Sequence, residues 1–129
     1  MSEYTLQTTV NLPFDRAIEH VTEALAAEGF GVLTTIDVKA TLRQKLDVDF
    51  RPYMILGACN PPFAYEALKA EPWIGAMLPC NVVLQQTEDG PVSVAALDPA
   101  ASMQAVENPA LEGIAGEVRD KLAKVIADL

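Results

Sequence analysis

Several features are scarce or missing in this sequence, and each absence excludes a class of function. The 129-residue chain has one histidine and two cysteines, so one subunit has no histidine-rich metal site and no framework of disulfide bonds. No apolar run approaches the roughly 18–20 residues that span a bilayer. No cluster of Lys or Arg offsets the formal net charge of −9, which repels phosphate backbones and anionic lipids. We therefore expect neither nucleic acid nor a membrane as a partner.

The N-terminal segment also lacks the basic start and the hydrophobic stretch of a secretory signal. A cytoplasmic location is therefore expected, where the cysteines would be thiols most of the time. What the chain does contain is typical of a globular protein, since 50% of its residues are hydrophobic and 21% are charged. Its length, with no linker or internal repeat, predicts a single domain over residues 1–129.

Hydrophobic periodicity predicts five strands and two long helices. We expect the strands over residues 4–10, 30–38, 53–59, 80–87 and 92–98, the last two joined by a hairpin turn at Asp89-Gly90. The long helices are expected over residues 13–28 and from Pro109 to the end of the chain, with shorter helical segments over 40–46 and 61–71. This order predicts an α+β fold, a two-layer sandwich in which a largely antiparallel five-stranded sheet carries the two long helices on one face.

The second face of the predicted sheet is apolar as well. Alternation along the strands assigns to it Leu33, Met54, Leu56, Val83 and Leu97. So many large hydrophobic side chains are not expected to stay in contact with water. We therefore expect a homodimer that forms through the sheet or its edge.

The two cysteines are the main candidates for chemistry. Cys59 ends the third strand and Cys80 begins the fourth, and in an antiparallel pair such ends face each other. Directly opposed residues have Cα atoms roughly 4.5–5.5 Å apart, which suits a disulfide or a pair of thiolates on a metal ion. Asp98 ends the fifth strand at the same edge. These three residues form the candidate site, and Asn60 and Asn81, which follow the cysteines, are further candidates for binding a ligand.

Each of these residues has a structural interpretation beside the functional one. Three helix starts share an Asx residue followed by proline: Asn60-Pro61, Asp98-Pro99 and Asn108-Pro109. Such an N-cap contributes about 0.5–2 kcal/mol, so we expect Asn60 and Asp98 to cap helices. The role of Asn81, at a strand start, stays open.

The cysteines also have a structural interpretation, because free cysteine is most often a small buried hydrophobic residue. Against this, the N-terminus of the helix after Asn60 is expected to lower the pKa of the Cys59 thiol. Two thiolates alone are too few for a structural metal site, and the chain has no CxxC or HxxxH spacing. A metal site at Cys59 and Cys80 is therefore a weak candidate, although a site shared across a dimer is conceivable.

Three other positions complete the set of candidates. His20 lies at the flank of a helical apolar stripe, which favours a solvent-facing or partly packed side chain. Asp37 and Lys39 follow the second strand, where a surface ion pair or a turn cap is favoured over a ligand site. Trp73 is expected to close the core or to form the wall of a pocket near Cys80.

Three segments, 29–46, 53–84 and 97–99, resemble a bacterial and archaeal family, domain of unknown function 302. The second segment carries the specific motifs GACNP and LPCNV. The resemblance implies a compact α+β fold with an antiparallel sheet packed against helices, usually as a homodimer, and it implies no reaction. It singles out a set of positions for testing: Gly57, Cys59, Asn60, Pro61, Pro79, Cys80 and Asn81.

Three functional hypotheses follow from the sequence. The first is a homodimeric binding module that holds a small molecule or a soft metal near Cys59 and Cys80. The second is a redox or sulfur-transfer enzyme with Cys59 as the nucleophile and Cys80 as the resolving thiol. The third is a structural or interaction protein in which both cysteines belong to the core. The sequence identifies no cofactor and no reaction.

Overall fold

The computed structural model describes residues 4–88 and 90–129. Five strands form one sheet: β1 (Thr5–Val10), β2 (Gly31–Asp37), β3 (Tyr53–Cys59), β4 (Cys80–Gln86) and β5 (Val92–Leu97). The helices in these ranges are α1 (Phe14–Ala27), α2 (Val38–Leu46), α3 (Pro61–Ala70), α4 (Pro99–Ser102) and α5 (Pro109–Ala127), with two 3₁₀ turns, η1 (Ile74–Met77) and η2 (Met103–Ala105). The predicted strands and long helices are confirmed to within one or two residues at most ends.

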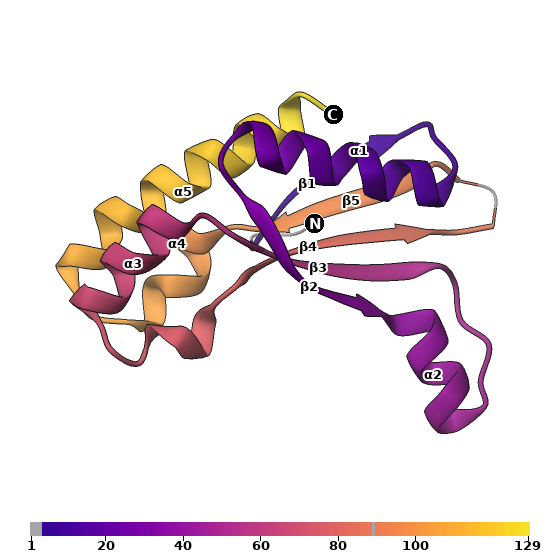
Figure 1. Ribbon diagram of the computed structural model, residues 1–129, viewed down its shortest axis with the longest axis horizontal. Coiled ribbons are helices and arrows are strands. Elements are labelled where there is room, and N and C mark those ends of the chain that lie inside the picture. The colour runs from indigo at the N-terminus through magenta and orange to yellow at the C-terminus, as the bar shows by residue number, and fades with distance from the viewer. Residues whose placement is uncertain (1–3, 89) are drawn as a thin grey trace.

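The strand order is β1-β5-β4-β3-β2, and every neighbouring pair is antiparallel. Strands β2 to β5 therefore form a meander, and the chain crosses from one sheet edge to the other between β1 and β2 by way of α1. Helices α1 and α5 lie on the same face of the sheet (Figure 1). The fold is the predicted α+β arrangement. Asp89, expected in the β4–β5 turn, lies outside the described residues.

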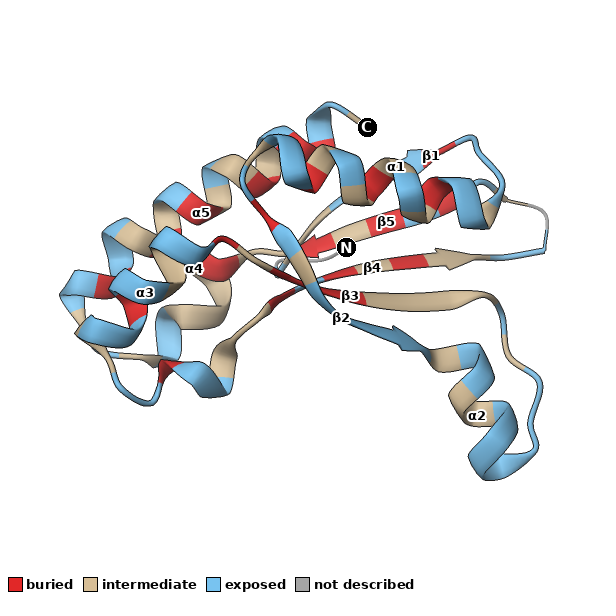
Figure 2. Cartoon of the chain, viewed as in Figure 1, coloured by how far each residue is buried: buried red, intermediate tan, exposed pale blue. Residues whose placement is uncertain are grey.

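The core lies between the sheet and these two helices. Ala17, Val21 and Leu25, spaced four residues apart on α1, are fully buried, and α5 buries Leu122 and Val125. These side chains pack against inward-facing residues of the strands, which alternate with exposed or half-buried ones along β4 and β5. Burial of one such Leu or Val side chain stabilises the fold by about 1.5–3 kcal/mol. The buried residues follow this interface in Figure 2.

The composition of the open sheet face differs from the sequence prediction. Leu56 is 1% exposed and Met54 packs on the core, so both face the helices. The assignment of these two was wrong because β3 pairs Leu56 with the inward-facing Val82 of β4. Val83 and Leu97 do lie on the open face, and Leu33 is 67% exposed at the bulge in β2.

A second hydrophobic cluster lies beyond the end of the sheet, among α3, η1 and α5. Its buried members are Ala67, Ile74 and Leu111. Helix α4 and η2 pack against α5 in the same region. Asp98 caps α4, since its side chain accepts hydrogen bonds from Ala100 N at 3.0 Å and Ala101 N at 3.4 Å. Asn108 caps α5 in the same way by accepting from Ala110 N. Both caps were predicted.

Helix α2 and the segment that returns to β3 form an arm, residues 38–52, that projects from the β2–β3 end of the sheet (Figure 1). Asp37 caps α2 by accepting from Ala40 N at 2.9 Å, which confirms the turn-cap interpretation. Lys39 Nζ donates to Asp49 and to the carbonyl oxygen of Phe50, which ties the returning segment to the helix. No residue of α2 is buried. The arm therefore has little packing of its own.

None of the helices within residues 4–88 and 90–129 combines the length and the apolar composition needed to cross a membrane.

Candidate functional site

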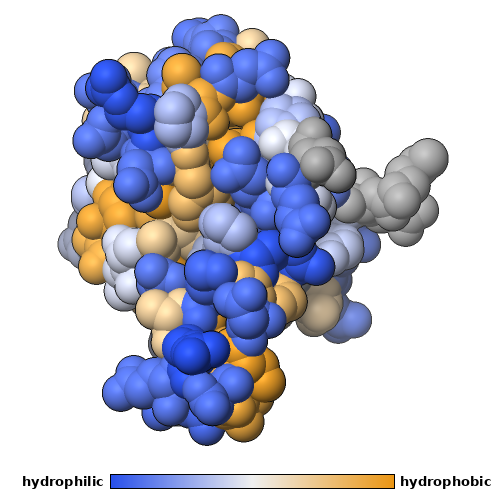
Figure 3. Space-filling view, turned by 90° about the vertical axis from the view of Figure 1, so that its right-hand side faces the viewer, coloured by the Kyte–Doolittle hydropathy of each residue, from blue (hydrophilic) through white to orange (hydrophobic). Residues whose placement is uncertain are grey.

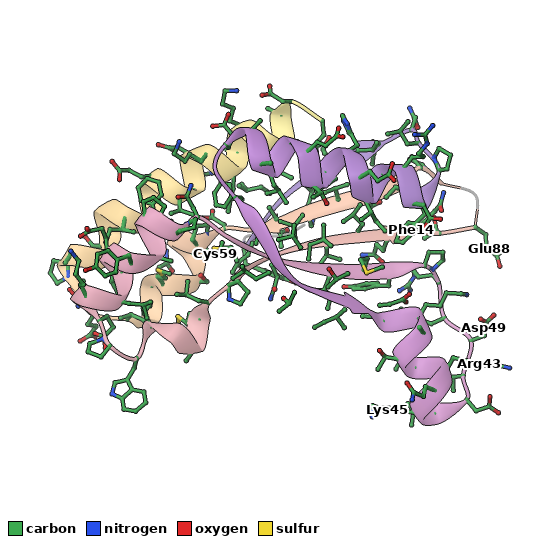
Figure 4. The ribbon with its side chains drawn as sticks, in the orientation of Figure 1. Phe14, Arg43, Lys45, Asp49, Cys59 and Glu88 are labelled. Carbon is green, nitrogen blue, oxygen red and sulfur yellow. The ribbon has the colours of Figure 1, made fainter. Side chains whose placement is uncertain are left out.

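The candidate site is a small cavity where the sheet meets the second cluster of helices. It lies between the C-terminal end of β3, the start of β4, α3, the start of α4 and α5. Its volume is about 30 Å³. Cys59 and Cys80 both line it, together with a mainly apolar wall: Phe30, Phe63, Leu78, Pro99, Ile114 and Val118. Both cysteines thus lie at the same end of the sheet, and Figure 4 shows Cys59 at this end.

The register of the two strands differs from the prediction by one residue. Ala58 is directly opposite Cys80, whereas Cys59 pairs with Gly31 of β2 on its other side. The strand boundaries were predicted correctly, but the pairing offset depends on the whole β3–β4 ladder and not on where each strand ends. The cysteines are therefore diagonal neighbours, and both are free thiols.

The two thiols have different surroundings. Cys80 is 6% exposed, and burial together with the charge of the nearby Cys59 raises the pKa of its thiol to about 11. Cys59 is half-buried, and burial raises the pKa of its thiol as well. The expectation that helix α3 would lower the pKa of Cys59 was wrong, because loss of solvation on burial raises this pKa.

Asn60 does not cap helix α3. It is 8% exposed, and its Nδ2 donates a hydrogen bond to the carbonyl oxygen of Glu28 at 3.3 Å. Gly29, which follows Glu28, has φ +87°, and a Cβ there would lie 3.1 Å from Asn60 Nδ2. The asparagine therefore fixes the turn between α1 and β2 against the end of β3. The predicted role was to cap the helix that follows Asn60. The observed hydrogen bond instead connects Asn60 to a turn 32 residues earlier in the chain.

Asp98 is occupied by structural contacts. Besides capping α4, its Oδ2 lies 3.1 Å from Arg119 Nε of α5, and its side chain is 14% exposed. The residue that reaches the cavity from this segment is Pro99, not Asp98. The predicted grouping of Asp98 with the two thiols is therefore not formed at the cavity.

Asn81 also lies away from the cavity. It is exposed, it pairs with Gly57, and alternation along β4 places it on the open face of the sheet. The two Cys-Asn motifs thus differ in three dimensions, since only the asparagine of GACNP is buried next to the cavity. In the described part of the chain, no three His, Cys, Asp or Glu residues are grouped so as to hold a metal ion.

Comparison with known proteins extends these observations. The model of the family "Domain of unknown function DUF302" matches residues 6–129. The chain belongs to the DUF302 family. The crystal structure of an uncharacterized conserved DUF302 protein from Bacillus stearothermophilus is similar, with a TM-score of 0.89, 31% identity and 98% of each chain covered. A search of curated proteins found no match.

In this DUF302 chain, the cavity also includes residues that the sequence did not single out. Met103 lies at the start of η2, in a segment that carries no recognisable motif, yet it lines the cavity beside the cysteines. Phe30 and Phe63 line it as well. Local spacing gave no signal for these residues because they come together only when α3, α5 and the sheet pack.

The exposure of Trp73 and of His20 tests two further predictions for this DUF302 chain. Trp73 is 84% exposed and does not line the cavity, so the prediction that it closes the core or walls a pocket near Cys80 was wrong. His20 is half-buried, with Nε2 3.4 Å from the backbone oxygen of Leu129, in keeping with a partly packed side chain.

Proposed function

We propose that this protein is a homodimeric binding module that holds a soft metal ion near Cys59 and Cys80. The observation that supports this function is that Cys59 and Cys80 lie on neighbouring strands at one end of the sheet and are both among the residues that line one small, mainly apolar cavity. Thiolates prefer soft metal ions, and a bound cation removes the repulsion between the two sulfur charges. Each thiol releases its proton to solvent as its sulfur binds the ion.

The size of the cavity favours an ion over an organic molecule. Sites for metabolites commonly have volumes of about 300–1,000 Å³. The present cavity, at about 30 Å³, has room for an ion or one or two water molecules. A metabolite would need α3 to separate from α5, which share the second hydrophobic cluster.

The thiol environments favour binding over catalysis. A nucleophilic or redox-active cysteine is normally activated by a lowered thiol pKa. Here the pKa of both thiols is raised by burial. A metal ion can displace the thiol protons even so, because the metal–thiolate bonds offset the cost of deprotonation.

The homodimer in this proposal forms through the open sheet face, with a second copy of the chain as the partner. Uncharged side chains occupy this face on all five strands: Thr5, Gln7, Thr9, Thr34, Ile36, Tyr53, Ile55, Asn81, Val83, Gln85, Ser93, Ala95 and Leu97. Two copies that each carry a formal charge of −9 repel one another, so an uncharged face is where they can approach. A basic partner protein would gain no attraction from this face, because the face carries no acidic side chains.

The α2 arm supports the same partner. Leu46 is 65% exposed, Val48 is 43% exposed, and α2 has no buried residue. An isolated helix of this length is marginal in water, and most helix stability comes from packing of an apolar face. The arm is the lower projection in Figure 3, where hydrophobic surface lies beside hydrophilic surface. A second copy on the open face would give the arm a surface to pack against.

Native mass spectrometry tests the metal site. Reduced protein is exposed separately to Cu(I), Zn(II) and Cd(II) without oxygen. We expect one soft ion per protomer in the parent protein and none in Cys59→Ala or Cys80→Ala, with circular dichroism showing that both variants fold. No uptake by the parent protein, uptake that survives both substitutions, or a bound organic molecule in place of an ion would overturn the proposal.

Light scattering coupled to size-exclusion chromatography tests the dimer. The parent protein should have twice the mass of one chain, and Ile36→Asp should give monomers because it places a charge on the open face. Leu68→Asp on α3 is the matched control, since Leu68 is 44% exposed and Ile36 47%. A monomeric parent protein, or a dimer that persists in Ile36→Asp but not in Leu68→Asp, would contradict the interface.

A further inference from the structure

The outer side of α3 and the bend that follows it carry exposed aromatic side chains. Trp73 is 84% exposed, Tyr65 on α3 is 63% exposed, and Leu68, three residues further along the helix, is 44% exposed. None of them lines the cavity or belongs to a strand of the sheet. Tryptophan and tyrosine are enriched among the residues that contribute most to protein–protein binding. Their exposure along one short segment indicates an interaction surface.

The backbone on both sides of Trp73 is anchored. Glu71 N donates to the carbonyl oxygen of Ala67 at 2.9 Å, Ile74 N donates to that of Glu71 at 3.1 Å, and Ala76 N donates to that of Trp73 at 3.1 Å. Ala67 and Ile74 are both buried in the second hydrophobic cluster. Trp73 is therefore exposed in a segment that is otherwise ordered by hydrogen bonds and by its buried neighbours.

The surface at this end of α3 is acidic. Glu71 is two residues before Trp73, and Asn108 Nδ2 lies 3.4 Å from Glu71 Oε1 and donates to the carbonyl oxygen of Ala70 at 2.9 Å. These contacts bring the segment that contains the exposed Glu107 to the end of α3. The C-terminal end of a helix also carries a partial negative charge. Cations are therefore favoured here.

Tyr65, on the same helix, already holds a cation. Lys69 Nζ lies 4.5 Å from the centroid of the Tyr65 ring and 3.1 Å from Glu66 Oε1, so a ring, an ammonium and a carboxylate form one group. Trp73 and Glu71 supply a ring and a carboxylate without the cation. Within residues 4–88 and 90–129, no Lys or Arg of this chain lies over the Trp73 ring. The tryptophan ring attracts cations more strongly than the tyrosine ring.

We infer that Trp73 and Glu71 bind an arginine side chain of a basic segment of another protein. A guanidinium group stacks on an aromatic ring and donates to a carboxylate through a planar fork, which an ammonium cannot do. The formal net charge of −9 favours the approach of a basic partner. The α2 arm, which carries several basic residues of this chain, lies at the opposite end of the molecule from α3 (Figure 1).

The fluorescence of Trp73 tests this binding directly, because Trp73 is the one tryptophan of the chain. The full chain, without added metal, is titrated with a capped peptide of alternating arginine and glycine. We expect a saturable change in the emission and weaker quenching by acrylamide, because the peptide covers the indole ring. The same peptide with glutamate in place of arginine should cause neither effect.

Two variants measured by calorimetry identify the groups that bind. Trp73→Leu retains an apolar side chain but removes the aromatic face, so the peptide should bind roughly two- to thirtyfold more weakly. Glu71→Gln retains an oxygen beside Asn108 but removes the charge, and a loss of roughly two- to fivefold is expected. Glu23→Gln on α1 is the matched control, because Glu23 is also an acid on a helix and is exposed. It should bind the peptide as the parent protein does.

The measured outcomes distinguish this site from a general attraction to charge. No binding of the arginine peptide by the parent protein, or equal affinities in Trp73→Leu and the parent protein, would overturn the inference. Equal losses in Glu71→Gln and Glu23→Gln would overturn the role of Glu71. Tighter binding of a lysine–glycine peptide or of an uncharged proline-rich peptide would overturn the choice of arginine. The proposed metal site and dimer have separate tests, so their failure would leave this result unchanged.

Discussion

Asn60 Nδ2 donates a hydrogen bond to the carbonyl oxygen of Glu28, 32 residues earlier in the chain. The bond joins the end of β3, next to Cys59, to the turn that follows α1. Asn60 is the only polar or charged residue that is buried in the described parts of the chain. One wall of the cavity is therefore anchored to the first helix by a side chain whose sequence context is that of a helix cap.

This bond gives the first prediction. Asn60→Ala should lower the free energy of unfolding by about 1–3 kcal/mol, because it removes the buried Asn60 side chain and leaves the part-buried Glu28 carbonyl without its partner. Asn81→Ala, in the second Cys-Asn motif, should change it by less than about 0.5 kcal/mol, because Asn81 is exposed. Urea denaturation of both variants at one protein concentration measures the difference. Equal losses would show that the two motifs are equivalent in structure.

The second prediction concerns the reactivity of the thiols. Cys59 is half-buried and Cys80 is 6% exposed with a thiol pKa of about 11, so iodoacetamide should modify Cys59 first. Modification of Cys80 in the folded protein should become appreciable only as the pH approaches 11, because the thiolate is the reactive form. Peptide mass spectrometry after timed alkylation measures both rates. Rapid modification of Cys80 at neutral pH would contradict the burial of this residue.

The third prediction is a pH dependence of stability that arises from the same thiol. The pKa of Cys80 is raised from its ordinary value of 9.0 to about 11 in the folded chain, so the folded state holds the proton more tightly. The resulting stabilisation is complete well below pH 9 and is lost as the pH rises toward 11, for a total of about 3 kcal/mol.

Cys80→Ala isolates this effect from other groups that titrate at high pH. The difference in free energy of unfolding between the parent protein and the variant should shrink by about 3 kcal/mol between pH 8 and pH 11. Denaturant melts at several pH values measure it. Parallel pH profiles for the two proteins would mean that the Cys80 thiol does not resist ionisation.

The fourth prediction concerns Gly57, on the open face where β2, β3 and β4 meet. A Cβ at this position would overlap the hydroxyl of Thr34 and lie 2.8 Å from Pro79 Cγ. Gly57→Ala should therefore lower the free energy of unfolding by about 1–3 kcal/mol. Thr34→Ala removes one of the two clashes, so the double variant should lose less than the sum of the single losses.

Gly113→Ala is the control for this comparison. Gly113 lies on the exposed side of α5, and a Cβ there meets no atom within 4 Å. The substitution should stabilise the protein by about 0.5–1 kcal/mol, because alanine favours a helix over glycine. If Gly57→Ala were as well tolerated as Gly113→Ala, the close approach of Thr34 and Pro79 would not be a constraint.

The fifth prediction separates the two structural contacts of Asp98. Asp98→Ala should lower the free energy of unfolding by about 1–2 kcal/mol, because it removes the cap of α4 and the ion pair with Arg119. Asp98→Asn keeps an oxygen for the cap and should lose less than about 1 kcal/mol, as expected for a partly exposed ion pair. Thermal and urea melts of both variants measure which substitution lowers the stability more. A larger loss for Asp98→Asn would mean that charge, and not capping, is the main contribution.

Much of the fold could be predicted from the sequence because it depends on local patterns. The apolar stripe of α1, with Ala17, Val21 and Leu25, already indicates both the helix and the face that it buries. The alternation of Val92, Val94 and Ala96 does the same for β5. Asp98 and Asn108 accept hydrogen bonds from backbone amides two or three residues ahead, so their capping roles need no distant partner.

The sequence by itself therefore determined the elements, their order, the antiparallel meander and the end of the sheet at which the cysteines lie. Only the tertiary structure decided that Ala58, and not Cys59, is opposite Cys80, because a register is set by a whole strand pair. It also gave Asn60 a partner in Glu28 and placed Met103 in the lining of the cavity. These contacts join residues far apart in the chain, and no local pattern of spacing or propensity encodes them.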